Sequence, residues 1–416
     1  MDPQNLQTRC CIAGGGPAGM MLGFLLGRAG IETIVLEKHA DFLRDFRGDT
    51  VHPSTLELMY ELGLLQDFLK RPHQEHPQIR AQIGSDEIVG ADFSTLTTHC
   101  RFVALMPQWD FLNFLAEQGQ RYPAFHVRME AEVSGLLEEG GRIAGVRAKT
   151  PAGELEVRAE LVVGADGRSS LVRERSGLQV DDLGAPMDVL WMRISRRPSD
   201  PAPLLRLDRG KLLVMLNRED YWQVGLVIRK GGAGEIREKG MDALRGSVVE
   251  LAPFLRDRVS ELGSWDDDVK LLTVKVDRLR QWWRPGLLCI GDAAHAMSPI
   301  GGVGINLAIQ DAVAAANILA GAFQHGNVTT DALSAVQRRR ALPTRLTQGM
   351  QVTIQNHVTA PLLASSKPLH APWYLPFLDW PTRRIRSRFL GIGFRAEHIQ
   401  TPDVVASQAD RLVFST

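Results

Sequence analysis

A glycine-rich turn near the first residues constrains the fold of this chain more than any other feature. The run at 14–19 reads Gly-Gly-Gly-Pro-Ala-Gly and fits the pattern GxGxxG. The flanking segments predict a strand, a helix and a second strand, at 9–13, 18–29 and 31–37. In such a unit Gly14 permits a tight turn, Gly16 lets a pyrophosphate approach the backbone, and Gly19 allows the helix to pack closely on the strand. The pattern therefore predicts a dinucleotide site at the helix N-terminus.

An acidic residue at the end of the second predicted strand narrows the kind of dinucleotide. Glu37 stands at this tip, where a carboxylate accepts hydrogen bonds from a ribose and favours free hydroxyls, as in FAD or NAD, over a 2′-phosphate. The uncharged stretch 10–27 superficially suggests a signal peptide or a membrane span. Asp2 accompanies Arg9 before it, and glycines interrupt it, so we expect a buried βαβ unit and no targeting or transmembrane segment.

Two further motifs place an aspartate after a predicted buried strand. The segment 161–168 reads LVVGADGR and precedes a predicted helix at 169–176. The segment 287–295 reads LLCIGDAAH, and a glycine-rich loop then leads into a predicted helix at 305–323. Doubly wound sheets bind ligands at the carboxyl ends of their strands, although an aspartate there is also typical of a helix cap or a turn. The three motifs in this order are more specific than any one of them.

This order of motifs resembles that of the p-hydroxybenzoate hydroxylase-like FAD-dependent monooxygenases, the group A flavoprotein hydroxylases. The matching motifs extend from Cys11 to about Ala315, and the match is weakest at 181–268. The resemblance implies an enzyme that uses FAD, NADPH or NADH, and O2 to hydroxylate an aromatic or quinone-like small molecule through a flavin C4a-hydroperoxide. It also implies an α/β fold: a Rossmann-like FAD-binding domain, an interleaved, mostly antiparallel β-sheet substrate domain and a helical C-terminal region.

The resemblance also implies contacts to the cofactor. Asp166 would serve both FAD and NAD(P)H, Asp292 the ribityl chain, and Arg47 the phosphates and the isoalloxazine. No catalytic residue is assigned; the region of His295 and Pro299, which borders the flavin in the family, and Arg47 are candidates. The expected cofactor-binding residues are Gly14, Gly16, Pro17, Ala18, Gly19, Glu37, Lys38, Arg47, Gln108, Asp166, Gly291, Asp292, Pro299, Gly302, Gly304, Ile305 and Asn306.

The predicted helix at 305–323 offers a physical reason for the contacts at its start. A reduced flavin carries negative charge at its N1/O2 edge, and the unpaired N–H groups and positive dipole end of a helix N-terminus suit that charge. Gly301, Gly302 and Gly304 let the backbone pass close to a flat ring without a Cβ clash.

The scattered motifs predict interleaved domains. The FAD-binding domain is expected at 1–75, 100–180 and 275–345, the substrate domain at 76–99 and 181–274, and a helical region at 346–416. Strand-like runs at 79–93, 188–194, 211–216 and 221–228 indicate a mostly antiparallel substrate sheet. Side chains expected to line its pocket are Trp191, Arg193, Met215, Asn217, Tyr221 and Gln223.

Composition limits the other functional classes. Lys and Arg total 48, as do Asp and Glu, so the formal charge is zero and a nucleic-acid partner is not expected. Four cysteines without a CxxC pair and histidines without ligand spacing indicate no metal site and a reduced, cytoplasmic location.

Two other functions are alternatives to a hydroxylase: another FAD oxidoreductase on the same scaffold (an oxidase, reductase or halogenase) and a non-catalytic redox sensor. The absence of a WxWxIP motif disfavours a tryptophan halogenase.

The stretch 371–395 combines an aromatic, proline-rich run with five arginines. Such a segment is typical of peripheral membrane contact, which favours a hydrophobic quinone or lipid-like substrate. We favour the alternative, a surface segment packed over the FAD domain. The oligomeric state is not indicated by the sequence.

Overall fold

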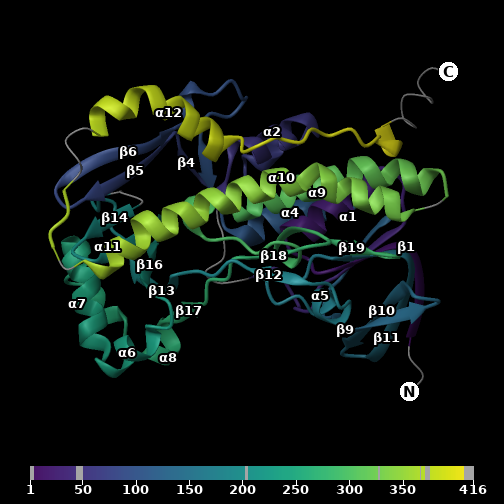
Figure 1. Ribbon diagram of the computed structural model, residues 1–416, viewed down its shortest axis with the longest axis horizontal. Helices are drawn as coiled ribbons and strands as arrows, with labels where there is room; N and C mark the ends of the chain where they lie inside the picture. The colour runs from purple at the N-terminus through teal and green to yellow at the C-terminus, as the bar shows by residue number, and fades with distance from the viewer. Residues whose placement is uncertain are drawn as a thin grey trace.

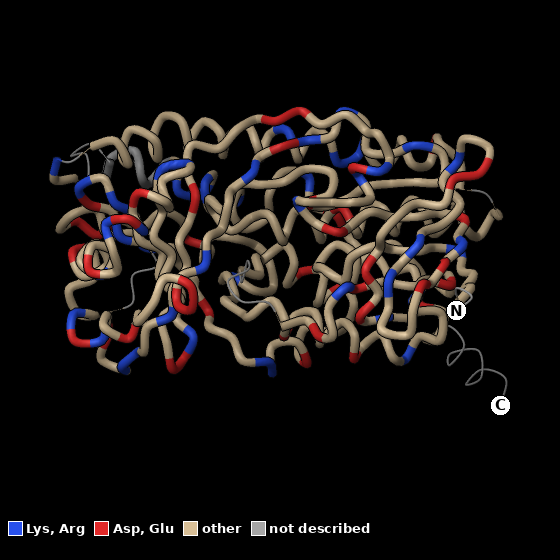
Figure 2. Tube along the Cα trace, turned by 90° about the horizontal axis from the view of Figure 1, so that it is seen from below, with Lys and Arg blue, Asp and Glu red and all other residues tan. Residues whose placement is uncertain are grey.

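The computed structural model describes residues 4–43, 50–201, 205–326, 328–365, 367–370 and 375–406, without the side chains of 375–381. Figure 1 shows an elongated molecule with a sheet toward each end. Two long helices, α9 (Gly304–Gln324) and α10 (Thr330–Ile354), run along its length. Basic and acidic residues are interspersed along the chain in the view of Figure 2, in keeping with the balanced charge.

The first sheet has the order β19-β20-β11-β1-β2-β8, and its neighbours from β20 to β8 are parallel. The strand β1 lies inside this sheet because it reads as a nearly continuous apolar run at its carboxyl half. The strands are β1 (Gln4–Ala13), β2 (Thr33–Leu36), β8 (Phe125–Arg128), β11 (Gly153–Gly164), β19 (Trp283–Arg284) and β20 (Leu287–Cys289), and β9 (Glu132–Glu139) and β10 (Arg142–Thr150) extend β11 in antiparallel fashion.

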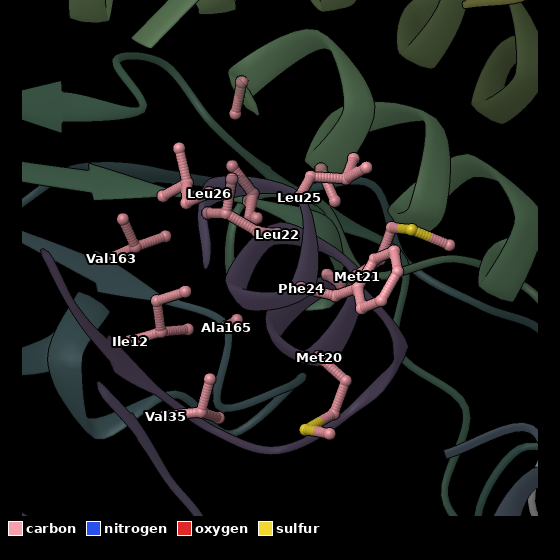
Figure 3. Close-up of a cluster of buried hydrophobic side chains, with 14 of the residues drawn as sticks. Ile12, Met20, Met21, Leu22, Phe24, Leu25, Leu26, Val35, Val163 and Ala165 are labelled. Atoms are coloured by element: carbon pink, nitrogen blue, oxygen red, sulfur yellow. The ribbon is translucent and has the colours of Figure 1, made fainter. Parts of the chain in front are cut away.

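The helix α1 (Pro17–Arg28) explains the uncharged stretch near the start of the chain. Its side chains pack between the first sheet and α9, where Met20 and Phe24 are at most 1% exposed (Figure 3). Full burial of such a side chain stabilises a fold by about 1.5–3 kcal/mol. The segment Ile300–Gln324 is also long and apolar enough to cross a membrane, but 78% of its most apolar window is buried inside the fold, as in a core helix.

The second sheet has the order β17-β13-β16-β15-β14-β5-β6, and every neighbouring pair is antiparallel except β14 with β5. The predicted mostly antiparallel substrate sheet is therefore confirmed. Its strands are β5 (Gln78–Ile83), β6 (Asp86–Asp92), β13 (Met187–Ser195), β14 (Leu205–Asp208), β15 (Lys211–Asn217), β16 (Tyr221–Arg229) and β17 (Lys270–Leu272).

Shorter elements complete the fold. The strands β3 (Thr50–Val51), β7 (Val103–Leu105) and β4 (Gln74–His76) form one small sheet, and β12 (Val180–Asp182) pairs with β18 (Asp277–Leu279). The other helices are α2 (Pro53–Glu61), α3 (Leu65–Phe68), α4 (Gln108–Gly119), α5 (Leu171–Arg175), α6 (Ala233–Glu238), α7 (Met241–Leu251), α8 (Trp265–Asp268), α11 (Ala360–Ala364) and α12 (Leu375–Gly391). One-turn elements are η1 (Phe93–Thr95), η2 (Pro253–Leu255), η3 (Val259–Glu261), η4 (Gly291–Ala293), η5 (Ile300–Gly302) and a π-turn, η6 (Gln355–Thr359).

The α/β fold class is confirmed, whereas the division into three regions stays a prediction. One proposed boundary, 345/346, falls inside the continuous helix α10, which accommodates Pro343. The predicted helix at 18–29 begins one residue earlier, because Pro17 occupies its first position, where a missing N–H costs nothing.

The helix α12 lies along β6 and η1, so most of it covers an edge of the second sheet (Figure 1). The packing over the FAD domain that we expected is seen at its end, where the Leu390 carbonyl oxygen accepts a hydrogen bond from His52. Arg386 Nε donates to the carbonyl oxygen of Gly90 at 3.0 Å, and the Asp92 N–H donates to Ser387 Oγ at 2.8 Å. The chain after α12 then returns to the first sheet's helices, where Asp403 accepts a 2.9 Å hydrogen bond from Tyr122. The C-terminal segment therefore ties both halves of the molecule together.

Candidate functional site

Three glycine-rich turns meet at one edge of the first sheet. The strand register pairs Ala13 with Gly164 and with Leu36, and Gly164 with Cys289, so four parallel strands end level. The turns that follow these residues therefore lie side by side. This is the carboxyl edge, where parallel α/β sheets bind their ligands.

Close backbone contacts hold the turns together. A Cβ on Gly14 would lie 2.4 Å from the carbonyl oxygen of Ala165, in the second turn. A Cβ on Gly291 would lie 3.2 Å from the Cβ of Ala18, which links the third turn to α1. Both glycines have positive φ, +106° and +58°, a region that L side chains rarely adopt. The spacing of the three motifs thus reflects one assembled site.

Glu37 lies directly beneath the first turn. The residue is 7% exposed. Its carboxylate accepts hydrogen bonds from the backbone N–H groups of Gly15, at 2.9 Å, and His39, at 3.1 Å. A carboxylate can accept about four hydrogen bonds, and the contact of Glu37 to a ribose hydroxyl stays a prediction. The neighbouring candidate Lys38 is exposed.

Asp166 caps a helix. Its carboxylate accepts from the hydroxyl of Ser170 and, at 3.1 Å, from the backbone N–H of Val172 at the start of α5. Burial raises the pKa of this carboxyl, although both hydrogen bonds act in the opposite direction. The structure therefore gives Asp166 a local role as a cap, and a contact to FAD or NAD(P)H stays a prediction.

The remaining candidates are spread around the same edge. Asp292 is half-buried in η4, Gln108 opens α4 and is half-buried, and Pro299 is exposed at the start of the glycine loop. Arg47 lies outside the described residues. We define the glycine loop as residues 299–304.

Asn306 fastens the glycine loop to β3. Its Oδ1 accepts from the His52 N–H at 2.9 Å and from Thr55 Oγ1 at 2.8 Å, and its Nδ2 donates to the carbonyl oxygens of Thr50, at 2.9 Å, and Gly302, at 3.3 Å. The Asn306 side chain thus makes its hydrogen bonds within the protein. The group of Asn306 that a ligand would contact is its backbone N–H.

The first hydrogen bond of α9 is donated by the Leu307 N–H to the Val303 carbonyl oxygen at 3.0 Å. The N–H groups of Gly304, Ile305 and Asn306 precede this bond, so they are the unpaired donors of the first helical turn. Their place next to the glycine loop is the one that the sequence predicted for the flavin edge.

Sequence reasoning missed the residues that hold the glycine loop from behind. Gln351 Nε2 donates to the carbonyl oxygens of Ser298, at 3.0 Å, and Ile300, at 2.9 Å. Gln348 and Gln355 lie on the same face of α10 and the following π-turn, and they donate to residues 296–298 as well. All three glutamines are 0% exposed. Their spacing of three and four residues along one helix face was the available signal.

His295 does not border an open site. It is 1% exposed, and its Nε2 donates to Asp311 at 2.5 Å. The other oxygen of Asp311 accepts from Arg340 Nε at 2.9 Å, and Arg340 also reaches Glu397 at 3.2 Å. Burial alone would raise the pKa of Asp311, but His295 and Arg340 lower it on balance. The Gly291 N–H also donates to Asp311, at 3.2 Å, so this buried network supports η4.

The second sheet presents two faces, and its register decides which side chains share one. Trp191 pairs with Gly225, and Arg193 with Gln223, so these side chains lie on one face together with Tyr221. The buried apolar side chains of this face pack with Ile300 of the glycine loop. This face is therefore the one turned toward the predicted flavin site.

Two of the predicted pocket residues lie on the opposite face. Met215 is buried in the cluster formed with α7, and Asn217 pairs with Trp222 of that same cluster. The structure therefore does not bring them together with Trp191 and Gln223, and we correct this part of the expected pocket. Asn217 Oδ1 instead accepts from the Glu219 N–H at 3.0 Å and shapes the hairpin turn.

The residues present fit the diphosphate of a dinucleotide. A Cβ placed on Gly16 would meet no described atom within 4 Å, so there is room directly above the turn. The first turn of α1, all of which is described, carries no acidic residue that would repel a phosphate. With Glu37 next to the turn, the residues at this edge fit the ADP half of FAD.

Comparison with known proteins assigns the chain to a family. The family described as "FAD binding domain" matches residues 7–349. The 6-methylpretetramide 4-monooxygenase of Streptomyces rimosus is 34% identical over 346 residues, which cover 83% of each chain. The anhydrotetracycline monooxygenase of Streptomyces rimosus is 28% identical over 73% of this chain and 60% of its own length. The crystal structure of pqsL, a probable FAD-dependent monooxygenase from Pseudomonas aeruginosa, has a TM-score of 0.71 at 22% identity, covers 86% of this chain and 98% of its own, and shows the same fold.

The chain belongs to this FAD-binding family. It is an FAD-dependent monooxygenase of the group A aromatic hydroxylase type, and the resemblance, the cofactor FAD and the enzyme class inferred from the motifs are confirmed. The roles of individual site residues stay predictions that the geometry above makes specific.

Proposed function

We propose that this monooxygenase hydroxylates an electron-rich ring of a polycyclic phenolic compound, with NAD(P)H and O2 as cosubstrates. The observation that carries the proposal is the 34% identity, over 83% of both chains, to a protein named 6-methylpretetramide 4-monooxygenase. A relative that matches at this level over nearly the whole length shares the substrate sheet as well as the cofactor domain.

The second sheet supports a flat, apolar substrate. A Cβ on Gly225 would lie 2.8 Å from the ring of Trp191, so the indole lies against the backbone of β16. Leu216 and Val227 belong to the same buried apolar face. Such a face holds a ring system by apolar contact and keeps water away from the reacting edge.

The cofactor domain holds the other reactant. When bound, FAD supplies electron transfer and oxygen activation. The glycine turn and Glu37 would hold its ADP half, and the N–H groups at the start of α9 would stabilise negative charge at the ring edge. The three buried glutamines Gln348, Gln351 and Gln355 hold the glycine loop and the residues just before it in place for this purpose.

The location in the cell belongs to the same proposal. All four cysteines are free and buried, and burial raises the pKa of each thiol, that of Cys11 to about 12, which disfavours the reactive thiolate form. This supports a reduced, cytoplasmic setting. Membrane contact through 371–395 is not part of the proposal, because Arg386 and Ser387 are used on β6.

The test is a turnover assay under ¹⁸O2. The purified holoenzyme is incubated with NADPH or NADH and either anhydrotetracycline or 6-methylpretetramide, and the products are analysed by mass spectrometry. We expect a product that carries one labelled oxygen, formed together with oxidation of the nicotinamide. Formation of hydrogen peroxide alone, with every polycyclic phenol tried, would refute the proposal.

A further inference from the structure

A buried amide on the substrate sheet has one half of its hydrogen-bonding capacity unused. Gln223, in the middle of β16, is 4% exposed. Its Oε1 accepts a 3.1 Å hydrogen bond from Arg218 Nε. Its Nε2 is buried without a hydrogen-bond partner in the part of the chain that the structure describes. Buried donors are almost always paired, so an unpaired one calls for a ligand.

The orientation of this amide is unambiguous. The Arg218 guanidinium has only donors, so the atom that faces it must be the amide oxygen. The NH2 group is consequently the other branch of the side chain, and it is held there by Arg218. The charge of Arg218 also acts on Asp110 in the first turn of α4, which places this arginine where the two halves of the molecule meet.

Gln223 lies on the face that the proposed substrate would contact. In the sheet register it pairs with Leu216 on one side and with Arg193 on the other. Trp191 and Gly225 follow on the same face, two positions along their strands. The face around Gln223 is thus apolar at Leu216 and Trp191 and charged at Arg193, and Ile300 of the glycine loop packs against the same face. In such surroundings an unpaired amide N–H discriminates strongly between a partner that carries an acceptor and one that does not.

We propose that Gln223 is a specificity-determining residue whose Nε2 donates a hydrogen bond to a phenolic or carbonyl oxygen of the aromatic substrate. Arg218 is its positioning residue, because it fixes which end of the amide is presented. This inference rests on the proposed function for the identity of the face, but it concerns the oxygen substituent and not the number of rings.

The experiment measures binding to the oxidised holoenzyme by the change in flavin absorbance, without turnover. The probes are three pairs that differ only in one hydroxyl: 4-methylphenol and toluene, 1-naphthol and naphthalene, and 1-hydroxyanthracene and anthracene. The variants are Gln223→Met, which keeps the length of the side chain but removes the donor, and Arg218→Met. The control is Met215→Leu, a change of similar volume on the opposite face of the same sheet.

We expect the wild type to bind the hydroxylated member of a pair about tenfold more tightly, equivalent to about 1.4 kcal/mol. Gln223→Met should abolish this preference without weakening the binding of the hydrocarbon. Arg218→Met should reduce the preference several-fold, and Met215→Leu should leave it unchanged. Methionine removes the unpaired donor but also the acceptor of Arg218 Nε, so the thermal midpoint of Gln223→Met should fall no further than that of Arg218→Met, which breaks the same hydrogen bond.

Three results would overturn the inference: a wild type that favours the hydroxylated partner in no pair, a Gln223→Met variant that keeps the wild-type preference, or one that only loses thermal stability. The proposed function fails in a different way. If the one-ring phenol binds and the larger phenols do not, the polycyclic substrate class is wrong while the role of Gln223 stands.

Discussion

Gly19 lies directly against the carbonyl oxygen of Gly14, since a Cβ on Gly19 would stand only 2.0 Å from that oxygen. Gly16, between them in the same turn, faces open space. The two glycines therefore serve different purposes: one permits the fold, and the other permits the ligand.

This difference predicts opposite results for two substitutions in one motif. Gly19→Ala should destabilise the protein by about 1–3 kcal/mol because the added methyl overlaps backbone. Gly16→Val should leave folding almost unchanged, because its φ of −75° and ψ of −179° are extended, but should abolish retention of FAD. Urea unfolding and the flavin content after gel filtration measure the two effects. Equal flavin content in Gly16→Val and wild type would contradict our site.

His52 makes the stability of the cofactor domain depend on pH. It is 1% exposed, its Nδ1 donates to the Leu390 carbonyl oxygen at 2.5 Å, and burial lowers its pKa to about 4. The His52 imidazole takes up a proton near pH 6.5 in the unfolded chain but only near pH 4 in the folded chain, so acidification favours unfolding. The free energy of unfolding begins to decrease as the pH falls through about 6.5, and the decrease reaches about 3 kcal/mol near pH 4.

His52→Asn retains a donor in the place of Nδ1 but does not titrate. We expect the urea midpoint of the wild type, measured with saturating FAD, to fall more steeply than that of His52→Asn between pH 7 and pH 5. Parallel pH profiles for the two proteins would show that His52 does not contribute.

Gln351 should affect the flavin without touching it. Gln351→Met retains the volume of the side chain but removes the hydrogen bonds to Ile300 of the glycine loop and to Ser298 just before it, at a cost of about 1–3 kcal/mol for the buried carbonyl oxygens left unpaired. We expect a higher dissociation constant for FAD and more hydrogen peroxide per NAD(P)H oxidised. Arg345→Met, on an exposed position of the same helix, is the matched control. The prediction fails if both variants release FAD equally.

The buried ion network under η4 predicts a large and partly reversible loss of stability. Arg340→Met leaves the carboxylates of Asp311 and Glu397 without their shared cation, and breaking such a buried pair costs about 3–5 kcal/mol. The double variant Arg340→Met with Asp311→Asn should recover part of this loss, because it removes one buried charge while the amide oxygen can still accept from His295 and from the Gly291 N–H. Chemical unfolding of the single and double variants measures the difference; a double variant less stable than the single one would refute this account.

Much of the cofactor domain was predictable because its signals are local. The glycine spacing, the apolar run of β1 and the acid at Glu37 each act through neighbours close in the sequence. The meeting of the three turns at the carboxyl edge was also predictable, since strands that end in GxGxxG, GADG and GDAAH must align there when they are parallel.

The residues that the sequence analysis missed or misplaced have a common physical cause. Their roles depend on partners that are far away in the sequence. Gln351 and Arg340 look like surface residues of a helix, and only the packing of α10 against the glycine loop and the tail buries them. Met215 was assigned to the pocket because it lies in the correct sheet. A strand's register decides its face, and a shift of one residue would exchange the two faces. No local pattern in β15 reveals that Leu216, and not Met215, opposes Gln223.

The late position in the chain of the residues that support the flavin site, from Gln351 to Glu397, has a consequence for biosynthesis. Proteins leave the ribosome from the N-terminus onward, at about 5–20 residues per second. The parallel strands of the first sheet are complete once Cys289 has been made, but the supports of the glycine loop and η4 are encoded later, and Leu390 and Glu397 are among the last of them. For several seconds the nascent chain thus has a finished sheet and an unfinished flavin site, so stable loading of FAD must wait until Glu397 has been made.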